Sequence, residues 1–303
     1  MLSDKEIVCP NNLLDVAHQK KGIPAGIVNA GKSITMMSVM DAVNENLIIP
    51  IFIGNKLDIE KCALELSFDI SEFKIIDEKN ENKTAVIAAE LASEDKIKII
   101  VKGHIHTDVL MKEVIKKKYN LIGKTRLSHI WHMSLDKEDK PLIITDGALN
   151  VSPNVKTKMH ILKNAINFCN RIGNKRPKVS VLSATEEVLD SVQSSIDAKE
   201  ITELAQKENL IADVFGPLAF DNSISKKSAE IKSIKNIVAG NADVLLVPSV
   251  ETGNALVKIM VYFMGACAAG VVVGGKVPVV ITSRSDVATA RLASIAAAVV
   301  ALD

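Results

Sequence analysis

Aromatic side chains are scarce in this chain, whose 303 residues include one tryptophan, two tyrosines and seven phenylalanines. Proteins that hold single-stranded nucleic acid stack its bases on aromatic rings that lie among basic residues, and no such interleaving is present here. The formal net charge of +1 also creates no strong field for a polyanion. The basic run at 116–118 is typical of a solvated helix end rather than of a binding patch. We therefore expect no nucleic-acid partner.

Cysteines are few and scattered, so the chain has no C-x-x-C pair; they are Cys9, Cys62, Cys169 and Cys267. This spacing indicates neither a zinc site nor a disulfide framework, and it fits a reducing cytoplasm. The first residues lack the pattern of a signal peptide. The most apolar region, 255–281, is interrupted by Lys258, Lys276 and several glycines, so it predicts no membrane span. We expect a cytoplasmic protein.

Short apolar runs rich in β-branched residues alternate with segments of helical periodicity. Strands are expected at 25–29, 47–53, 74–77, 97–101, 127–133, 141–145, 179–183, 244–248, 268–273 and 277–281. Helices are expected at 34–46, 56–66, 83–93, 107–119, 156–172, 197–208 and 252–264, with an Ala-rich helix toward the C-terminus. This alternation favours an α/β protein with a mostly parallel sheet and helices on both faces.

The pattern changes after Gly123, where two predicted strands, 127–133 and 141–145, flank a charged turn and resemble an antiparallel hairpin. We therefore expect a second lobe. The first lobe would take residues 1–133 plus 275–303 and be discontinuous in sequence, and the second would take residues 134–274. A chain of this length is sufficient for two modest domains.

One motif suggests a nucleotide triphosphatase or a kinase. Residues 26–33 match G-x-x-x-x-G-K-[ST], and 142–146 could then be a Walker B strand. A phosphate-binding loop needs its strand before the first glycine, whereas here the predicted strand includes Gly26. The turn that remains is too short to wrap two phosphates. Gly31 is interpreted as a turn glycine and Ser33 as a helix cap.

Histidines at alternate strand positions can ligate a metal because their side chains face the same side. His104 and His106 have this spacing, but Gly103 marks a strand end and places them in the loop before a helix. His129 and His132, three residues apart, face opposite sides of a strand. No paired acidic cluster stands out as the remaining ligands, so we predict no metal site. The loop histidines could instead contact a phosphate or an adenine.

The segment from Val277 onward joins a buried strand to the Ala-rich helix. Between them lie Ser283, Arg284 and Asp286, which place a hydroxyl, a guanidinium and a carboxylate just past a strand end. Unpaired N–H groups at a helix N-terminus favour an anion, and ligands of open α/β sheets bind outside the carboxyl ends of strands. A capping box of Ser283 with Asp286 is the structural alternative, and it leaves Arg284 unexplained.

Several longer motifs follow one another in a fixed order. They are KGHIHTD at 102–108, RLSH at 126–129, LIITD at 142–146, GPLAFDNSIS at 216–225, AGNADVLLVP at 239–248, ETGN at 251–254 and TSRSD at 282–286. In GPLAFDNSIS, the Gly-Pro and Asp-Asn pairs each indicate a turn, and a simple strand-linking loop is the alternative. From about residue 25 to the end, the series resembles the phosphate acetyl/butyryltransferase family, and its butyryltransferase branch in particular.

The resemblance implies two three-layer α/β/α lobes with the architecture of isocitrate and isopropylmalate dehydrogenases, and an active site in the cleft between them. It implies a reversible reaction in which an acyl-CoA and inorganic phosphate give an acyl phosphate and CoA, with butyryl or a similar short acyl group. No metal or bound cofactor is needed, since both partners are substrates. The implied assembly is a homo-oligomer, a dimer or larger. Fold alone would not establish this function.

The resemblance also implies roles for individual residues. Arg284 would bind phosphate and stabilise the developing oxyanion, and Ser283 would hydrogen-bond the phosphate or the CoA sulfur. Asp286 is the candidate for the group that removes the thiol proton. The substrate-binding candidates are His104, His106 and Thr107 from the first lobe and Gly253, Asn254 and Lys258 from the second. For each of these six, the alternative is a turn or cap residue.

The chain departs from the family pattern at four positions. Tyr262 and Met111 stand where the acetyltransferase branch carries arginines, and Ala290 stands where it carries its acid; Phe215 replaces an acid that is frequent in the butyryltransferase branch. The alternatives are a phosphate acetyltransferase, a non-catalytic protein that binds CoA or phosphate, and an oxidoreductase of the same architecture. The oxidoreductase would need a metal-binding set of aspartates, which the sequence does not supply.

Overall fold

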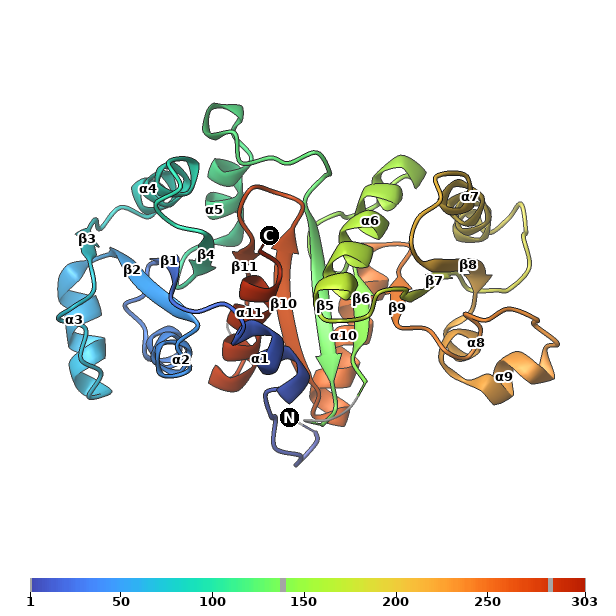
Figure 1. The fold of residues 1–303 in the computed structure, drawn as a ribbon, viewed down its shortest axis with the longest axis horizontal. Helices are drawn as coiled ribbons and strands as arrows, with labels where there is room; N and C mark the ends of the chain where they lie inside the picture. Colours follow the sequence, from blue (N-terminus) through green and yellow to red (C-terminus); the bar gives the residue numbers. More distant parts are fainter. Residues whose placement is uncertain (1, 137–139, 283–285, 303) are drawn as a thin grey trace. The chain divides into compact units, whose positions relative to one another are not determined.

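The computed structural model describes residues 2–136, 140–282 and 286–302. The chain divides into two compact units, and each is discontinuous in sequence. The first unit takes residues 7–124, 136–138 and 267–303, and the second takes 1–6, 125–135 and 139–266. In both units helices cover strands, as Figure 1 shows, which confirms the predicted α/β class.

The first unit contains a sheet segment that is parallel except at one strand. Its order is β3 (Ile75–Asp77), β2 (Ile48–Gly54), β1 (Ile23–Val28), β4 (Ile99–Lys102), β11 (Val279–Val280) and β10 (Cys267–Val273). Only β10 runs antiparallel to its neighbour within this set. Ile27, Ile99 and Ile100 are fully buried, because helices cover both faces of a parallel sheet and its strands become almost continuously apolar.

Two sets of helices cover this sheet segment. They are α1 (Asn11–Ala17), α2 (Ser33–Asn44), α3 (Lys56–Glu65), α4 (Glu81–Ser93), α5 (Thr107–Val114) and α11 (Ala288–Val300). Helix α11 packs on β10 and against α1 and α2, while α4 packs against α5; Figure 1 shows these two groups on opposite sides of the strands. The small side chains of α11 favour its close packing, and eight of its positions from Ala293 to Val300 are buried.

Three local predictions for this unit need correction. The helix predicted at 107–119 ends at Val114, because Lys116 is extended, and a short 3-10 helix, Lys117–Tyr119, follows it. Strand β1 begins before Gly26, at Ile23, although Gly26 still lies inside it as predicted. Ser33 is the first residue of α2 and Lys32 occupies the N-cap position, so Ser33 is not the cap.

The second unit has five strands in the order β5 (Ser128–Ser134), β6 (Leu142–Thr145), β9 (Val244–Leu246), β7 (Lys178–Leu182) and β8 (Asp213–Leu218). Strands β5 and β6 are antiparallel with Ile130 opposite Thr145, which confirms the predicted hairpin. The remaining pairs are parallel. The helices are α6 (Val155–Arg171), α7 (Gln193–Lys207), α8 (Phe220–Ile224), α9 (Lys226–Ile231) and α10 (Val250–Met264).

The predicted lobe ranges differ from these units at two strands. They place most of β5 in the first lobe, whereas β5 pairs with β6 and groups with the second unit. They place β10 in the second lobe, whereas β10 pairs with β11 and carries α11, which holds it in the first unit. Strand pairing decides the first assignment, and strand pairing together with the packing of α11 decides the second.

The turns predicted in the 216–225 motif are absent. Gly216 and Pro217 lie inside β8, joined by a cis peptide bond, and Asp221 and Asn222 lie in the short helix α8. A Cβ on Gly216 would stand 2.6 Å from the carbonyl oxygen of Val181. This glycine is therefore required by the close approach of β8 to β7, not by a turn.

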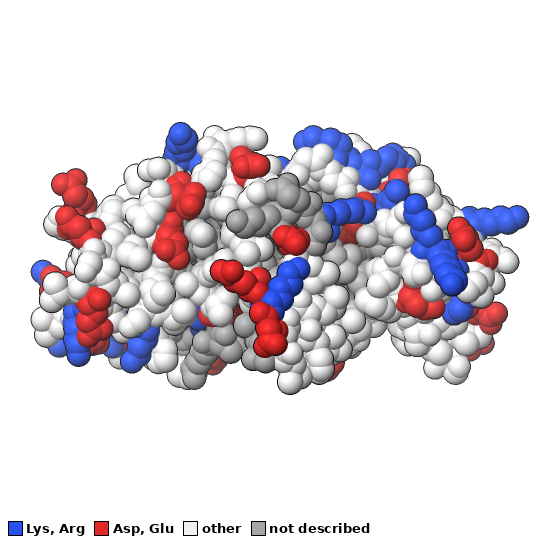
Figure 2. All heavy atoms as spheres, turned by 90° about the horizontal axis from the view of Figure 1, so that it is seen from below, with Lys and Arg blue, Asp and Glu red and all other residues white. Residues whose placement is uncertain are grey.

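Acidic and basic side chains are interspersed over the face of the protein that Figure 2 presents. This distribution agrees with the near-neutral formal charge of the whole sequence. None of the helices in the described ranges combines the length and the hydropathy needed to cross a membrane.

Candidate active site

Three loops of the first unit leave neighbouring parallel strands at the same edge of the sheet. They follow β1 at Asn29, β4 at Gly103 and β11 at Ile281, and β4 lies between the other two strands. Ligands of open α/β sheets bind at such a carboxyl edge. Two predicted catalytic residues, Ser283 and Arg284, belong to the third loop and lie outside the described residues.

The loop after β4 is fixed against the loop after β1. A Cβ on Gly103 would stand 2.4 Å from the carbonyl oxygens of both Val28 and Asn29, so only glycine allows this approach. The next residue, His104, donates its backbone N–H to the Asn29 carbonyl at 2.8 Å, while its side chain is exposed. The backbone of the predicted histidine loop is therefore held in one position by its neighbour.

His106 is oriented by a residue that the sequence did not reveal. One carboxylate oxygen of Glu81 accepts the backbone N–H of His106 at 2.6 Å and lies 2.8 Å from its Nδ1. The bond from the backbone N–H is the main cause that holds the pKa of Glu81 below its usual value. An ionised Glu81 favours the tautomer with the proton on Nδ1, which leaves Nε2 as an acceptor.

The N-terminus of α5 places the remaining first-unit candidates. His106 is its N-cap residue and Thr107 its first residue, and both side chains are exposed. Lys102, the last residue of β4, is buried although it carries an ammonium group, which lies 3.5 Å from the Gly103 carbonyl. Lys102 opens the KGHIHTD motif, but the motif alone predicts no role for it.

A buried arginine of α11 contacts the residue that lies two positions before the helix. Arg291 is 6% exposed, and its Nε donates to the backbone carbonyl of Asp286 at 3.1 Å. Burial lowers the pKa of Arg291, and the charge of Asp286 acts in the opposite direction. Helix α11 begins at Ala288 with Val287 at the N-cap. Asp286 therefore precedes the helix, and the capping-box alternative is wrong.

The candidates of the second unit lie on α10, which begins at Val250, before the predicted start. Gly253 is buried, and a Cβ on it would stand 2.7 Å from the Cα of Gly147. Asn254 donates its side-chain amide to the Gly147 carbonyl at 3.4 Å. Lys258 lies one turn further, with Nζ 5.8 Å from the centre of the Tyr262 ring. Gly253 thus allows α10 to pack closely against Gly147, independently of any role in substrate binding.

Asp146, at the end of the segment that could pass for a Walker B strand, has a structural explanation. Its buried carboxylate accepts backbone N–H groups from His129 at 3.0 Å and from Ala148 and Leu149 at 2.9 Å each. The side-chain amide of Asn150 also donates to it, at 2.6 Å. The aspartate joins the two strands of the hairpin to the loop that follows.

No group of three histidine, cysteine, aspartate or glutamate side chains suited to a metal ion is found within 2–136, 140–282 and 286–302. His129 and His132 lie in β5 and are both buried. Burial lowers the pKa of His132 to about 4, so its ring is neutral at physiological pH.

Comparison with known proteins matches the chain to one family. The family model for phosphate acetyl/butaryl transferase matches residues 78–299, more than half of the chain. A phosphate acetyltransferase of Rickettsia typhi is 37% identical over 285 residues, which cover 93% of this chain and 82% of that protein. A phosphate butyryltransferase of Clostridium acetobutylicum is 32% identical over 290 residues, which cover 95% of this chain and 96% of that protein.

Solved structures agree with this assignment. A branched-chain phosphotransacylase from Enterococcus faecalis V583 matches with a TM-score of 0.80 at 31% identity, covering 91% of this chain and 97% of that one. A putative 4-hydroxythreonine-4-phosphate dehydrogenase from Salmonella typhimurium gives 0.59 at 13% identity, covering 93% and 99%, a likeness of fold alone. These matches confirm the dehydrogenase-like architecture. On its family model and its relatives above 30% identity, this chain belongs to the phosphate acetyl/butaryl transferase family.

Proposed function

We propose that this chain is a phosphate acyltransferase that moves a short acyl group reversibly between CoA and inorganic phosphate. A phosphate oxygen attacks the thioester carbonyl, the carbon–sulfur bond breaks, and the CoA thiolate takes up a proton; the reverse reaction returns that proton. Holding phosphate beside the carbonyl is mainly a problem of orientation. The observation that carries the proposal is membership of a family whose relatives bear both transferase names.

We propose roles for three of the residues that follow β11. Arg284 binds phosphate through bidentate charge-assisted hydrogen bonds and stabilises the oxyanion that forms on the carbonyl. Ser283 hydrogen-bonds the phosphate or the CoA sulfur. Asp286 is the proposed acid and base for the thiol proton. The bond between Arg291 and the Asp286 carbonyl supports this role, because it fixes the backbone at Asp286.

The substrate-binding residues come from both units. His104, His106 and Thr107 follow β4 at the carboxyl edge of the first unit. Gly253, Asn254 and Lys258 lie in the first turns of α10 in the second unit. The helix N-termini of α5 and α10 supply N–H groups that favour anionic parts of the substrates. Neither a metal ion nor a resident cofactor is part of the proposal.

The acyl group is proposed to be butyryl or a similar short chain, on the resemblance of the motifs to the butyryltransferase branch. Acetyl is the alternative, favoured by the name and identity of the Rickettsia typhi relative. Phe215, a half-buried residue of β8, stands where the butyryltransferase branch often has an acid. We also propose a homo-oligomer, a dimer or larger, and a cytoplasmic location, which the four free thiols support.

Release of CoA thiol from acetyl-, propionyl- and butyryl-CoA, with and without phosphate, tests the proposal. We expect release that depends on phosphate and is fastest with butyryl-CoA. Arg284→Ala should lose at least about a hundredfold in kcat, because removing one oxyanion donor costs about two to three orders of magnitude. The matched control is Arg176→Ala, whose side chain is 63% exposed and pairs with Asp213.

The outcomes separate the alternatives. Fastest release from acetyl-CoA would assign the acetyltransferase reaction and reject the proposed acyl preference. No release from any of the three thioesters by folded protein would reject short-chain acyl transfer and favour a protein that only binds CoA or phosphate. Equal activity of the Arg284→Ala and Arg176→Ala variants would remove Arg284 from the site.

A further inference from the structure

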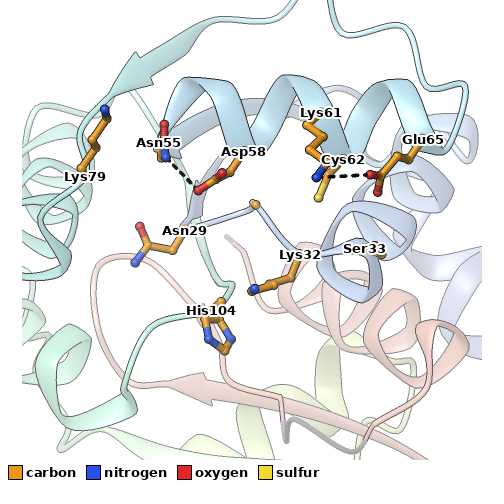
Figure 3. A pocket seen from close by; sticks show the side chains of 11 residues that line it. Asn29, Lys32, Ser33, Asn55, Asp58, Lys61, Cys62, Glu65, Lys79 and His104 are labelled. Atoms are coloured by element: carbon orange, nitrogen blue, oxygen red, sulfur yellow. Dashed lines mark hydrogen bonds and ion pairs between the residues drawn. The ribbon is translucent and has the colours of Figure 1, made fainter.

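A polar cavity of about 430 Å³ opens in the first unit beside the predicted histidine loop. Figure 3 shows its walls: helix α3 on one side, and the loops that follow β1 and β4 on the other. Its lining includes Asn29, Lys32, Lys61, Lys79 and His104. These residues follow three strands, β1, β3 and β4, or lie on α3 after β2. The cavity therefore lies at the carboxyl ends of four parallel strands.

The position of the cavity is a topological switch point. Strand β1 has β2 on one side and β4 on the other, so the connections leaving β1 and β4 diverge at this edge. Such divergence leaves a crevice above the sheet, and ligands of open α/β proteins bind there. Gly31 lets the loop after β1 lie close to α3, since a Cβ on it would stand 2.8 Å from the Cβ of Asp58.

The charges in the cavity favour an anion. Within 2–136, 140–282 and 286–302, neither Lys32 nor Lys79 has an acidic group within ion-pair distance. Lys61 lies 3.9 Å from Glu65 on its own helix. Asp58 is engaged by the side-chain amide of Asn55 at 2.8 Å. Two ammonium groups are thus left for a ligand, while the acidic residues have partners.

The N-terminus of α2 adds backbone donors to the same wall. The helix has twelve residues and begins at Ser33, and Lys32 at the N-cap makes no side-chain capping bond. The first N–H groups of a helix have no partner within the helix and carry the positive end of its dipole. The helix end and the two lysines therefore act on the same space, and each favours a phosphate group.

We propose that this cavity binds the phosphorylated adenosine end of CoA, which rests on the proposed function. CoA carries its reactive thiol and its nucleotide phosphates at opposite ends. The loops follow one another along the carboxyl edge in the order β11, β4, β1 and β2, about 4.8 Å apart per strand. A thiol at the loop after β11 leaves the nucleotide two to four strands away, at Lys32 after β1 and Lys79 after β3.

The proposal gives the G-x-x-x-x-G-K-[ST] sequence a role in binding the nucleotide end of CoA. It does not make the sequence a triphosphate-binding loop. Gly26 lies inside β1, where its missing side chain makes room for Ile97, 2.6 Å from the position of a Cβ. Of the motif's residues, Asn29, Gly31, Lys32 and Ser33 line the cavity. They supply one helix end and one ammonium group, which suits the separate phosphates of a nucleotide end rather than a wrapped chain of three.

Charge-removing variants of the two lysines test the proposal with two substrates. Lys32→Ala, Lys79→Ala and the double variant are compared with Lys74→Ala, an exposed lysine of the same unit outside the cavity. Each enzyme is assayed with butyryl-CoA and with butyryl-pantetheine, which lacks the nucleotide. We expect each single variant to raise KM for butyryl-CoA about three- to tenfold, with kcat and the KM for phosphate unchanged.

The truncated substrate decides whether the lysines act on the nucleotide. With butyryl-pantetheine, the lysine variants should match wild type and Lys74→Ala. An equal rise in KM for both substrates would overturn the proposal, since the lysines would then act elsewhere on the acyl-CoA. So would a KM for butyryl-CoA no higher in Lys32→Ala and Lys79→Ala than in Lys74→Ala.

Direct binding separates this inference from the proposed function. Calorimetric titration with adenosine 3′,5′-bisphosphate should give a dissociation constant that rises in the double variant and not in Lys74→Ala. If that holds but no thioester releases thiol, the nucleotide site stands and the proposed function fails. If thiol is released normally and the titration shows no dependence on the lysines, the nucleotide site fails alone. Adenosine 3′,5′-bisphosphate should also inhibit thiol release in competition with butyryl-CoA. Inhibition that is not competitive would show that the cavity binds a nucleotide other than that of the substrate, and it would overturn the proposal.

Discussion

Lys158 and Asp197 form an ion pair between helices α6 and α7, with Nζ 2.8 Å from the carboxylate and side chains that are 5% and 15% exposed. Gln193 donates a second hydrogen bond to the same carboxylate at 2.8 Å. The pair is nearly removed from water, so each charge depends on the other for compensation. It holds together two helices that cover one side of the second unit.

Breaking this pair should be costly. Lys158→Met leaves Asp197 buried without its counter-charge, and we expect the free energy of unfolding to fall by about 3 kcal/mol. Urea denaturation followed by circular dichroism measures this. The double variant Lys158→Met, Asp197→Leu should recover most of the loss. Lys199→Met, at an exposed position of α7, serves as control, and a loss in Lys158→Met no larger than in this control would contradict the prediction.

Glu81 should act on the reaction through His106. Glu81→Ala removes the acceptor for both the backbone N–H and Nδ1 of His106, so we expect kcat/KM for butyryl-CoA to fall about tenfold, a barrier change of about 1.4 kcal/mol. Glu81→Gln should be milder, since its amide oxygen still accepts the backbone N–H. Steady-state kinetics measure both effects.

The control for Glu81 is Glu90→Ala, an exposed position on the same helix α4. Thermal unfolding of all three variants separates orientation of His106 from simple loss of helix packing. A drop in melting temperature without a drop in kcat/KM would mean that Glu81 only joins α4 to α5.

His132 should make the protein less stable in acid. Its pKa is lowered to about 4 by burial, so below its unfolded value of about 6.5 the unfolded chain binds a proton that the folded chain does not. The free energy of unfolding should therefore fall as pH drops from about 6.5 to 4, by on the order of 3 kcal/mol from this residue. Its ring packs against that of Phe168, with centroids 6.5 Å apart.

His132→Leu should remove that part of the pH dependence, whatever it does to stability at pH 7. Urea denaturation at several pH values between 4 and 7 gives the slope for each protein. His18→Asn is the control, because His18 is partly exposed and pairs with Glu45. An unchanged slope in His132→Leu would show that His132 is not the group that titrates on unfolding.

Gly103→Ala should disturb the histidine loop. The added Cβ would meet two backbone carbonyl oxygens at 2.4 Å, and backbone cannot move aside as a side-chain end can, so we expect a loss of about 1–3 kcal/mol in stability and a higher KM for butyryl-CoA. Gly173→Ala is the comparison, because nothing lies within 4 Å of its Cβ position while its φ is +95°. Strain alone should cost about 1 kcal/mol there, without a change in KM.

The strands and helices were predictable where the hydrophobic period was long and uninterrupted. Strand β4 and helices α3, α6 and α11 lie within a few residues of their predicted positions. A strand buried on both faces is a continuous apolar run, and a helix buried on one face has apolar residues at helical spacing, so both can be recognised from the sequence. The end of α5 could not be predicted. The helical pattern continues past Val114, but the backbone of Lys116 is extended, and local propensity does not indicate this. Likewise Gly216 and Pro217 have turn propensity, but pairing of β8 with β7 overrides it.

Some residues of the candidate site could likewise be predicted from the sequence, and others could not. Motif residues such as His104 and His106 could be named from the sequence because they follow a strand. Glu81, Lys102 and Arg291 could not, since their importance comes from contacts with residues elsewhere in the chain or from burial of a charge. Glu81 reaches His106 across 25 positions, and only the packing of α4 on α5 brings them together. Lys32 was considered as part of the G-x-x-x-x-G-K-[ST] motif, but its proposed role in binding a phosphate follows from its place in the cavity.

The four cysteines of the folded enzyme should interfere little with an assay that detects free thiols. All are free and buried, and burial raises the pKa of Cys9 and Cys169 to about 12 and also raises the pKa of Cys62 and Cys267. A disulfide dye that colours on meeting a thiolate will therefore react slowly with the folded protein and rapidly with CoA as it is released. Any molecule that unfolds during the assay would instead expose its sulfurs and add four equivalents of colour at once, so the same cuvette would report turnover and loss of the native state.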